Sequence, residues 1–406
     1  MAVLTANMQV LELSSLQVLS YEGPTDASLL ARRFLTLVAS PAAEEARGGS
    51  GCVSKVANCQ GESFALKSML PVREDDPQER YRIQAARRQA FFEEYEAHLA
   101  VSGVPGIPLL YGLGLLSGEP VMLMDWVEGQ TLSGAKDLLP QVSGERGTTG
   151  RVVASIGLAV ARVLLMARGH APGFVHRDVS ARNIMLRGTP EMIRQQLDEL
   201  DVSVCLIDMG SSHVPQANRT SITMGADVWR YGTPEYAAPE MLVREDDIIT
   251  QRRSYSIDVY ALCSVLYELY AGYAPYNMRT NASRFDMSAH DMKSQFGPIA
   301  LALHDEADRP LAELILAGIV AEQDERITLE ELYDGLHAYL GVAGMSAAQL
   351  IERGFQVGRP VPGQLDVLDT QAGGCRITGP LPEWLTAAMS MPPGRIRRQI
   401  RDFFSQ

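Results

Sequence analysis

The chain has 406 residues, of which 46% are hydrophobic and 21% are charged, and its formal net charge at pH 7 is −13. This composition is ordinary for a globular protein, and the length allows a large enzyme core. No run approaches the ~18 apolar residues that a membrane helix needs, and the acidity argues against broad binding to nucleic acid or anionic lipid, so we expect neither a membrane segment nor a nucleic-acid partner.

The beginning of the chain predicts an extension in a cytoplasmic protein. Residues 1–20 have no basic region and no unbroken apolar stretch, so they do not resemble a secretory signal. Residues 1–33 alternate only weakly between apolar and polar side chains and include the turn signal Gly23-Pro24, which predicts an N-terminal extension of uncertain structure. The five cysteines are scattered and never form a C-x-x-C pair, which argues against disulfides and a zinc site.

Two regions with different periodicity follow this extension. Runs with strand character at residues 34–38, 63–66 and 121–124 surround a charged helical stretch at 78–101, which predicts a small sheet with one helix. From about residue 133 to 340 apolar residues recur every three or four positions, which predicts a helical region. The segment 341–406 is rich in proline and glycine and has a basic last helix, so we interpret it as an appended tail.

A glycine-rich turn and a lysine lie in the first of these regions. Glycines between two strands let backbone N–H groups approach phosphates closely, but a purely structural loop explains this turn equally well. The turn consists of Gly48, Gly49, Ser50, Gly51, Cys52 and Val53. Lys67 follows on the next predicted strand and could hold a phosphate by its charge. A lysine there needs an anionic partner, and we favour Glu94, with Glu93 and Glu96 as alternatives.

The stretch HRDVSARN, residues 176–183, combines an acid and an amide on one short loop. The Asp178 carboxylate could orient a hydroxyl and accept its proton, and the Asn183 amide could hold Mg²⁺. Asp208 follows the apolar strand 202–207 and precedes Met209 and Gly210, where a carboxylate could ligate the same kind of metal ion. Each group has a simple structural explanation, but their order along the chain is specific.

This ordered set resembles the eukaryotic-like (Hanks-type) serine/threonine protein kinase family over residues 34–340. Further motifs support the resemblance: residues 232–240 (GTPEYAAPE) resemble the P+1 loop and APE motif, and residues 258–262 resemble the start of the central helix of the C-lobe. Arg326 matches the arginine that pairs with the APE glutamate, here Glu240. The resemblance implies an α+β, two-lobed kinase fold with a β-rich N-lobe at about 34–124, a hinge at 125–130, a helical C-lobe at 131–340 and a tail at 341–406.

The resemblance also implies roles for individual residues. Asp178 would be the catalytic base, Lys67 would bind the α- and β-phosphates of ATP, and Asn183 and Asp208 would bind Mg²⁺ or Mn²⁺. The nucleotide would be bound by the glycine-rich turn together with Ala65, Glu94, the gatekeeper Met124 and the backbones of Asp125 and Val127. Phosphorylation of the activation loop is expected at Thr220, Ser221 or Thr223, with pairing to Arg177, and a homodimer would allow it to occur in trans.

Four features depart from the family pattern. Ala46 replaces the first glycine of the loop, Met209 replaces the phenylalanine of Asp-Phe-Gly, and insertions lengthen 67–94 and 183–208. Ser180 occupies the place of a lysine that contacts the γ-phosphate, and Arg182 is the expected replacement, as in the Ala-Ala-Arg of tyrosine kinases. Thr233, placed to hydrogen-bond Asp178, favours Ser/Thr acceptors.

Two other functions and one role for the tail remain open from the sequence. A pseudokinase that acts as a nucleotide-binding scaffold would explain Ser180, although Lys67, Asp178, Asn183 and Asp208 are all present. A small-molecule phosphotransferase would not require the complete activation segment. The third concerns the tail: its prolines and basic last helix suggest that it docks on the C-lobe and regulates it.

Overall fold

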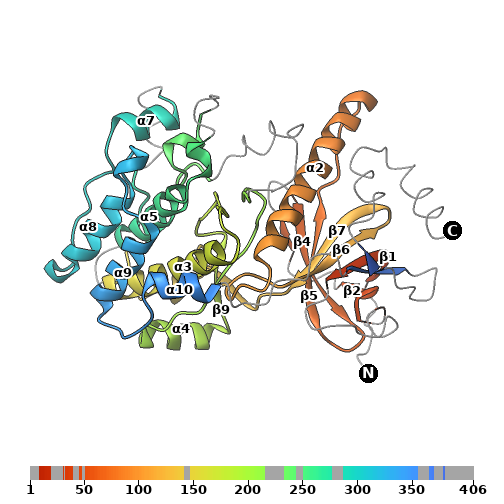
Figure 1. The fold of residues 1–406 in the computed structure, drawn as a ribbon, viewed down its shortest axis with the longest axis horizontal. Helices are drawn as coiled ribbons and strands as arrows, with labels where there is room; N and C mark the ends of the chain where they lie inside the picture. Colours follow the sequence, from red (N-terminus) through yellow and green to blue (C-terminus); the bar gives the residue numbers. More distant parts are fainter. Residues whose placement is uncertain are drawn as a thin grey trace. The chain divides into compact units, whose positions relative to one another are not determined.

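The computed structural model describes residues 9–19, 31, 33–39, 45–47, 51–140, 147–214, 233–243, 250–276, 287–354, 365–369 and 378–379. The chain divides into an N-terminal unit (residues 1–103, 108–126 and 358–406) and a C-terminal unit (104–107 and 127–357). The N-terminal unit is rich in strands and the C-terminal unit is mainly helical, as the resemblance predicts (Figure 1). Both units take segments from beyond the predicted lobe boundaries, as described below.

The N-terminal unit is built on an antiparallel sheet that closes on itself. Its strands are β1 (Gln9–Leu19), β2 (Thr36–Ala39), β3 (Glu45–Arg47), β4 (Gly51–Asn58), β5 (Ser63–Met69), β6 (Leu110–Leu116), β7 (Glu119–Asp125), β11 (Leu365–Asp369) and β12 (Thr378–Gly379). The first part of β1 pairs with β2 and its second part pairs with β6, so β1, β2, β4, β5, β7 and β6 form a closed circuit.

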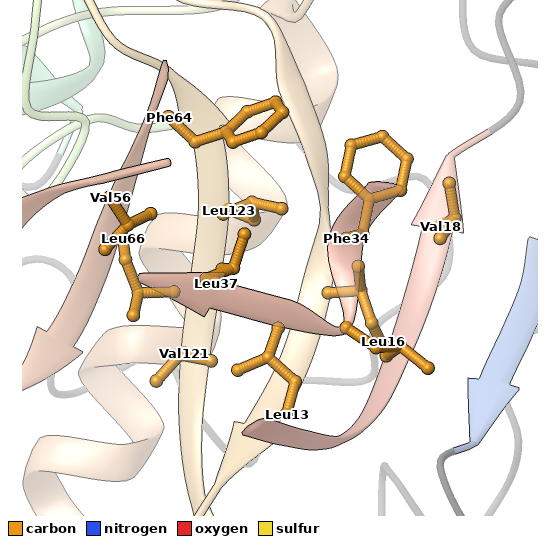
Figure 2. Packing of buried hydrophobic residues seen from close by; sticks show 11 residues of the cluster. Leu13, Leu16, Val18, Phe34, Leu37, Val56, Phe64, Leu66, Val121 and Leu123 are labelled. Atoms are coloured by element: carbon orange, nitrogen blue, oxygen red, sulfur yellow. The ribbon is translucent and has the colours of Figure 1, made fainter. Parts of the chain in front are cut away.

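Strand β1 was not expected in this sheet, because residues 1–33 were predicted to be an extension of uncertain structure. Leu13 and Leu16 have no exposed surface and pack with Leu37, Leu66 and Leu123 inside the closed sheet (Figure 2). β1 also lies so close to β6 that a Cβ on Gly112 would be 2.2 Å from the Gln17 carbonyl oxygen. The start of the chain is therefore part of the core of the N-terminal unit.

Helix α2 (Pro77–Val101) covers the other face of this sheet, and it agrees closely with the predicted helix at 78–101. Its first turn is stabilised by Asp76, whose side chain accepts a hydrogen bond from the Gln78 N–H, and by a proline at the first helical position. Successive side chains of a strand point to opposite faces. Ala65, Met122 and Met124 accordingly form a second apolar cluster with aromatic residues of α2, including Phe91 and Tyr95.

The C-terminal unit consists of helices and a small three-stranded sheet. The helices are α3 (Gly150–His170), α4 (Pro190–Glu199), α5 (Ser256–Ala271), α7 (Ala289–Gln295), α8 (Arg309–Gly318), α9 (Leu329–Leu340) and α10 (Ala347–Gly354). The strands are β8 (Gly129–Thr131), β9 (Ile184–Arg187) and β10 (Val204–Leu206), in the order β10-β9-β8. α4 forms within the predicted insertion between residues 183 and 208, and it buries Ile193 and Leu197.

Helix α3 is long and apolar enough to span a membrane by length and composition alone. However, 89% of its most apolar window is buried, and it packs against α5, α9 and α10. We therefore interpret α3 as the core helix of the C-terminal unit.

The predicted tail contributes to both units. Helix α10 packs so closely on α3 that a Cβ on Gly169 would lie 2.4 Å from the Ile351 carbonyl oxygen. Strand β11 pairs with residues 15–19 of β1 in the N-terminal unit. Docking of the tail on the C-lobe is thus supported for α10, whereas the predicted basic last helix lies outside the described residues.

Candidate active site

In the N-terminal unit, Lys67 and Glu94 form a buried ion pair. Lys67 lies on β5, Glu94 lies on α2, and their side chains are 5% and 4% exposed. Glu93, one of the two alternatives, instead accepts a hydrogen bond from Gln89 on its own helix. The predicted choice of Glu94 is confirmed. Because each charge compensates the other away from water, removal of one would leave the other uncompensated.

The strands next to Lys67 bring together several residues predicted to bind nucleotide. β4 pairs with β5 so that Val53 lies opposite Lys67. A Cβ on Gly51 would lie 2.7 Å from the Ser68 carbonyl oxygen, so this glycine is required by the close approach of the two strands. Ala65 lies opposite Met124 of β7, and Val53 packs against the same apolar cluster. Gly48, Gly49 and Ser50 lie outside the described residues, so their predicted contact with phosphate stays a prediction.

Asp125, at the end of β7, has a structural role that the sequence did not reveal. Its carboxylate accepts hydrogen bonds from the Tyr111 hydroxyl at 2.7 Å and from the Leu109 N–H at 3.2 Å. Burial, together with this carboxylate, raises the pKa of Tyr111. The Asp125 N–H donates to the Leu109 carbonyl oxygen at 2.8 Å. Val127, half-buried, follows two residues later, and the predicted contact of the Asp125 and Val127 backbones with adenine stays a prediction.

In the C-terminal unit, the Asp178 carboxylate is held by two residues. One oxygen accepts hydrogen bonds from the Thr233 N–H at 2.8 Å and the Thr233 hydroxyl at 2.9 Å. The other accepts from the Asn183 amide nitrogen at 2.9 Å. Burial raises the pKa of Asp178, the hydrogen bonds from Thr233 and Asn183 oppose this, and the charge of Asp208 adds to it. The predicted contact between Thr233 and Asp178 is confirmed.

The backbone just before Asp178 is fixed by an acid from the central helix. The two carboxylate oxygens of Asp258, in the first turn of α5, accept hydrogen bonds from the His176 and Arg177 N–H groups, each at 2.8 Å. Arg177 has a φ of 64°, an uncommon conformation for a residue with a side chain, and these two bonds stabilise it. Its buried Nε donates to the Arg252 carbonyl oxygen at 2.9 Å. Sequence reasoning missed this role of Asp258, although an acid opening an apolar helix was its signal.

Asn183 and Asp208 lie at the same end of a strand pair. Asn183 precedes β9 and Asp208 follows β10, and the antiparallel pairing places Ile184 opposite Leu206. Asp208 has a φ of 65° and accepts a hydrogen bond from the Gly210 N–H at 3.1 Å. The Asn183 amide nitrogen is engaged by Asp178, so its carbonyl oxygen is the atom suited to bind a cation. One carboxylate and one carbonyl oxygen fit Mg²⁺, which prefers oxygen ligands.

Ser180, at the position of the missing lysine, has a buried side chain that is not directed to solvent. Its side chain has no exposed surface, and among the described residues its hydroxyl has no hydrogen-bond partner. Its carbonyl oxygen accepts from the Asn183 and Ile184 N–H groups, which closes the loop turn. Arg182, by contrast, is exposed to solvent. This arrangement is compatible with the predicted use of Arg182, which stays a prediction. Phosphorylation at Thr220, Ser221 or Thr223 also stays a prediction, because these residues lie outside the described part of the chain.

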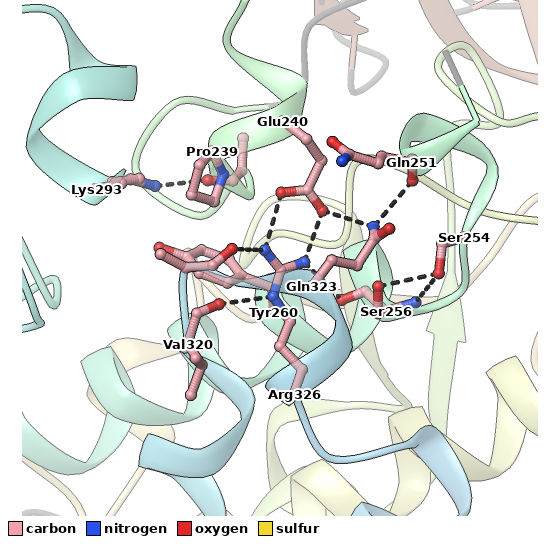
Figure 3. A network of polar contacts seen from close by, with 12 residues as sticks. Pro239, Glu240, Gln251, Ser254, Ser256, Tyr260, Lys293, Val320, Gln323 and Arg326 are labelled. Carbon is pink, nitrogen blue, oxygen red and sulfur yellow. Dashed lines mark hydrogen bonds and ion pairs between the residues drawn. The ribbon is translucent and has the colours of Figure 1, made fainter. Parts of the chain in front are cut away.

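The predicted pair of Arg326 and Glu240 is confirmed (Figure 3). The two guanidinium nitrogens donate to the two carboxylate oxygens at 2.6 and 2.9 Å. Gln323 donates to the same carboxylate at 2.9 Å, and the guanidinium lies over the Tyr260 ring at 4.9 Å. This network fixes the short helix η3 (Pro239–Met241), which follows the segment that contains Thr233.

Comparisons with known proteins agree with this geometry. A family model described as protein kinase domain matches residues 46–339. The serine/threonine-protein kinase PknE of Mycobacterium tuberculosis is 27% identical over 319 residues, which are 78% of this chain and 49% of the relative. The serine/threonine-protein kinase PkaB of Streptomyces coelicolor is 31% identical over 187 residues, which are 46% of this chain and 39% of the relative.

A fungal relative, the serine/threonine-protein kinase pkpA of Phycomyces blakesleeanus, is 27% identical over 180 residues, 44% of this chain and 24% of the relative. The matches thus span about half or less of the length of these curated relatives. The family model, however, covers well over half of this chain, and the motifs on which the resemblance rests lie within it. The chain belongs to the protein kinase family.

Proposed function

We propose that the chain is a serine/threonine protein kinase that transfers the γ-phosphate of ATP to serine or threonine hydroxyls of protein substrates. The observation that carries this proposal is the Asp178 carboxylate, which is held by Thr233 and Asn183 on a loop whose backbone is fixed by Asp258. A carboxylate held at both oxygens by neutral donors remains an acceptor, and it is positioned to orient a hydroxyl.

In this reaction the acceptor oxygen forms a bond to the γ-phosphorus while the bond from that phosphorus to the β–γ bridging oxygen breaks. Asp178 orients the acceptor hydroxyl and takes its proton. The raised pKa of the Asp178 carboxyl makes its ionised form a better proton acceptor. Mg²⁺ bound by Asn183 and Asp208 would neutralise charge on the phosphates.

Other residues would bind and orient the nucleotide. We assign Lys67 to the α- and β-phosphates, because its charge is held on β5 by Glu94. Gly51, Val53, Ala65 and Met124 would line the adenine and ribose contacts of the same unit. In the C-terminal unit, the exposed Arg182 would supply the charge that a lysine at position 180 provides in other members of the family.

Specificity for serine and threonine is supported by Thr233. Its hydroxyl donates a hydrogen bond to Asp178, the proposed base. Thr233 belongs to the segment that, by the resemblance, receives the protein acceptor. The three relatives named above are each called a serine/threonine-protein kinase, which agrees with this assignment. We further propose autophosphorylation of the activation loop in trans and a cytoplasmic location.

The experiment that tests the proposal measures transfer of labelled γ-phosphate from Mg-ATP to a generic basic protein, with phosphosites mapped by mass spectrometry. Asp178→Asn should lower the rate about 10²–10⁴-fold, because removal of a general base has this effect. Phosphoserine or phosphothreonine that disappears in the variant supports the proposal. Nucleotide binding without any transfer by the wild-type protein would instead favour a pseudokinase scaffold.

A further inference from the structure

Lys293 on α7 is a fully buried lysine that no sequence motif singled out. It has no exposed surface, and its ammonium donates to three backbone carbonyl oxygens: Ala237 at 2.6 Å, Pro234 at 2.8 Å and Glu235 at 3.2 Å. These three bonds use all three N–H donors of the group. All three carbonyl oxygens belong to residues 234–237. We call these residues, together with Thr233, the acceptor segment. Figure 3 shows Lys293 directed toward this part of the chain.

The surroundings of Lys293 act on its ammonium form in opposite directions. The rings of Tyr260 and Tyr276 each lie 5.4 Å from its nitrogen, which is a favourable cation–π distance. The carboxylates of Glu235 and Glu240 favour the charged form, burial disfavours it, and burial is the larger effect, so the pKa is lowered to about 7. The guanidinium of Arg326 also lies over the Tyr260 ring, 4.9 Å from its centre.

The choice of lysine is itself informative. The chain has only four lysines, Lys55, Lys67, Lys136 and Lys293, and its other basic residues, apart from histidine, are arginines. An ammonium is compact and has three rotatable donors, whereas a guanidinium is a planar fork. Three carbonyl oxygens that converge on one point match the ammonium. Lysine therefore suits this buried position.

The acceptor segment joins Lys293 to the catalytic loop. At one end Thr233 donates twice to Asp178. Farther along, the Tyr236 hydroxyl donates to Glu268 at 2.6 Å, and Tyr236 lines a cavity of about 240 Å³ that Ala181 of the catalytic loop also lines. His290, on the same helix as Lys293, contacts the Pro239 carbonyl oxygen at 3.0 Å. Helix α7 thus holds the backbone of the segment that contacts the proposed base.

We propose that Lys293 is a positioning residue for the protein acceptor. It holds the acceptor segment so that Thr233 contacts Asp178 and Tyr236 keeps its place in the lining of the cavity. The inference rests on the proposed kinase function and adds a residue outside the catalytic motifs. It predicts a defect in the use of the protein acceptor and not in the use of ATP.

The test compares Lys293→Met, whose unbranched side chain is one atom shorter and has no N–H donors, with Arg194→Met, which removes a charge from the exposed face of α4. We expect kcat/KM for a peptide acceptor to fall about 10–100-fold in Lys293→Met, since small misplacements near the chemistry have effects of this size. KM for ATP should change less than about twofold. Arg194→Met should match the wild type.

Two further measurements separate positioning from folding. If Lys293 acts through Thr233, Lys293→Met should cause little additional loss of kcat/KM for the peptide acceptor when Thr233 is already replaced by valine. If Lys293→Met does not fold, Lys293→Gln, which keeps two N–H donors, should show the same split with a smaller loss. Unchanged acceptor kcat/KM, or equal losses in the peptide and ATP readouts, would overturn the inference. A wild-type protein without any transfer would instead refute the proposed function on which it rests.

Discussion

The ion pair between Arg326 and Glu240 offers the sharpest test of how the C-terminal unit is held together. We consider Arg326→Met, which keeps an unbranched but shorter side chain and removes the guanidinium. The Arg326 side chain is 0% exposed and that of Glu240 is 6% exposed, so the carboxylate would remain buried with Gln323 as the donor that the structure shows. The carbonyl oxygens of Val320 and Ala321, each 2.7 Å from the guanidinium, would also lose a donor.

The expected loss follows from these contacts. Removal of one partner from a buried ion pair costs about 3–5 kcal/mol, because the other charge is left uncompensated. Each buried carbonyl oxygen that loses its donor can add about 1–3 kcal/mol, although relaxation reduces this. We therefore expect the free energy of unfolding to fall by about 5 kcal/mol. Domains are stable by only about 5–15 kcal/mol, so the C-terminal unit should be close to unfolding.

The assay is urea unfolding of the wild type, Arg326→Met, Glu240→Gln and the double variant. The double variant should be more stable than the sum of the single losses predicts, because it leaves no unpaired charge. Arg309→Met, which breaks the exposed ion pair with Glu306, is the matched control and should change little. A loss below about 1 kcal/mol in Arg326→Met, or strict additivity in the double variant, would refute the reasoning.

Two further predictions concern the core and the buried lysine. Leu16→Ala should lower the free energy of unfolding by about 2–5 kcal/mol, because Leu16 is fully buried in the closed sheet. Val10→Ala, at a position 50% exposed on the same strand, is the control and should have a small effect. Equal effects in urea unfolding would argue against β1 as part of the core. Burial lowers the pKa of Lys293 from 10.5 to about 7. Between these two pH values Lys293 is protonated in the unfolded chain and neutral in the folded chain, so the free energy of unfolding rises with pH. The full difference corresponds to about 5 kcal/mol, and Lys293→Met should remove this rise; a pH profile parallel to that of the wild type would contradict the burial argument.

The parts of the fold that local patterns specify could be predicted, and the parts that depend on distant pairing could not. The boundaries of α2 and the pairings of Lys67 with Glu94 and of Arg326 with Glu240 followed from periodicity and from motifs in a fixed order. β1 was missed because its alternation is weak and its burial depends on pairing with β2 and with β6, the second of which lies far along the chain. Lys293 was missed because a single lysine in a short, mostly polar helix has no local sign of burial.

The closed sheet of the N-terminal unit has a consequence for fragments of this protein. The region that matches the family model, residues 46–339, contains neither β1 nor β11 nor β2. In such a fragment β6 would keep β7 but lose β1, and β4 would keep β5 but lose β2, so each would present unpaired backbone N–H and C=O groups along one edge, which invite pairing between chains. Boundaries drawn from the family motifs alone would therefore favour aggregation during expression, and soluble material should require the segment from about residue 9 onward.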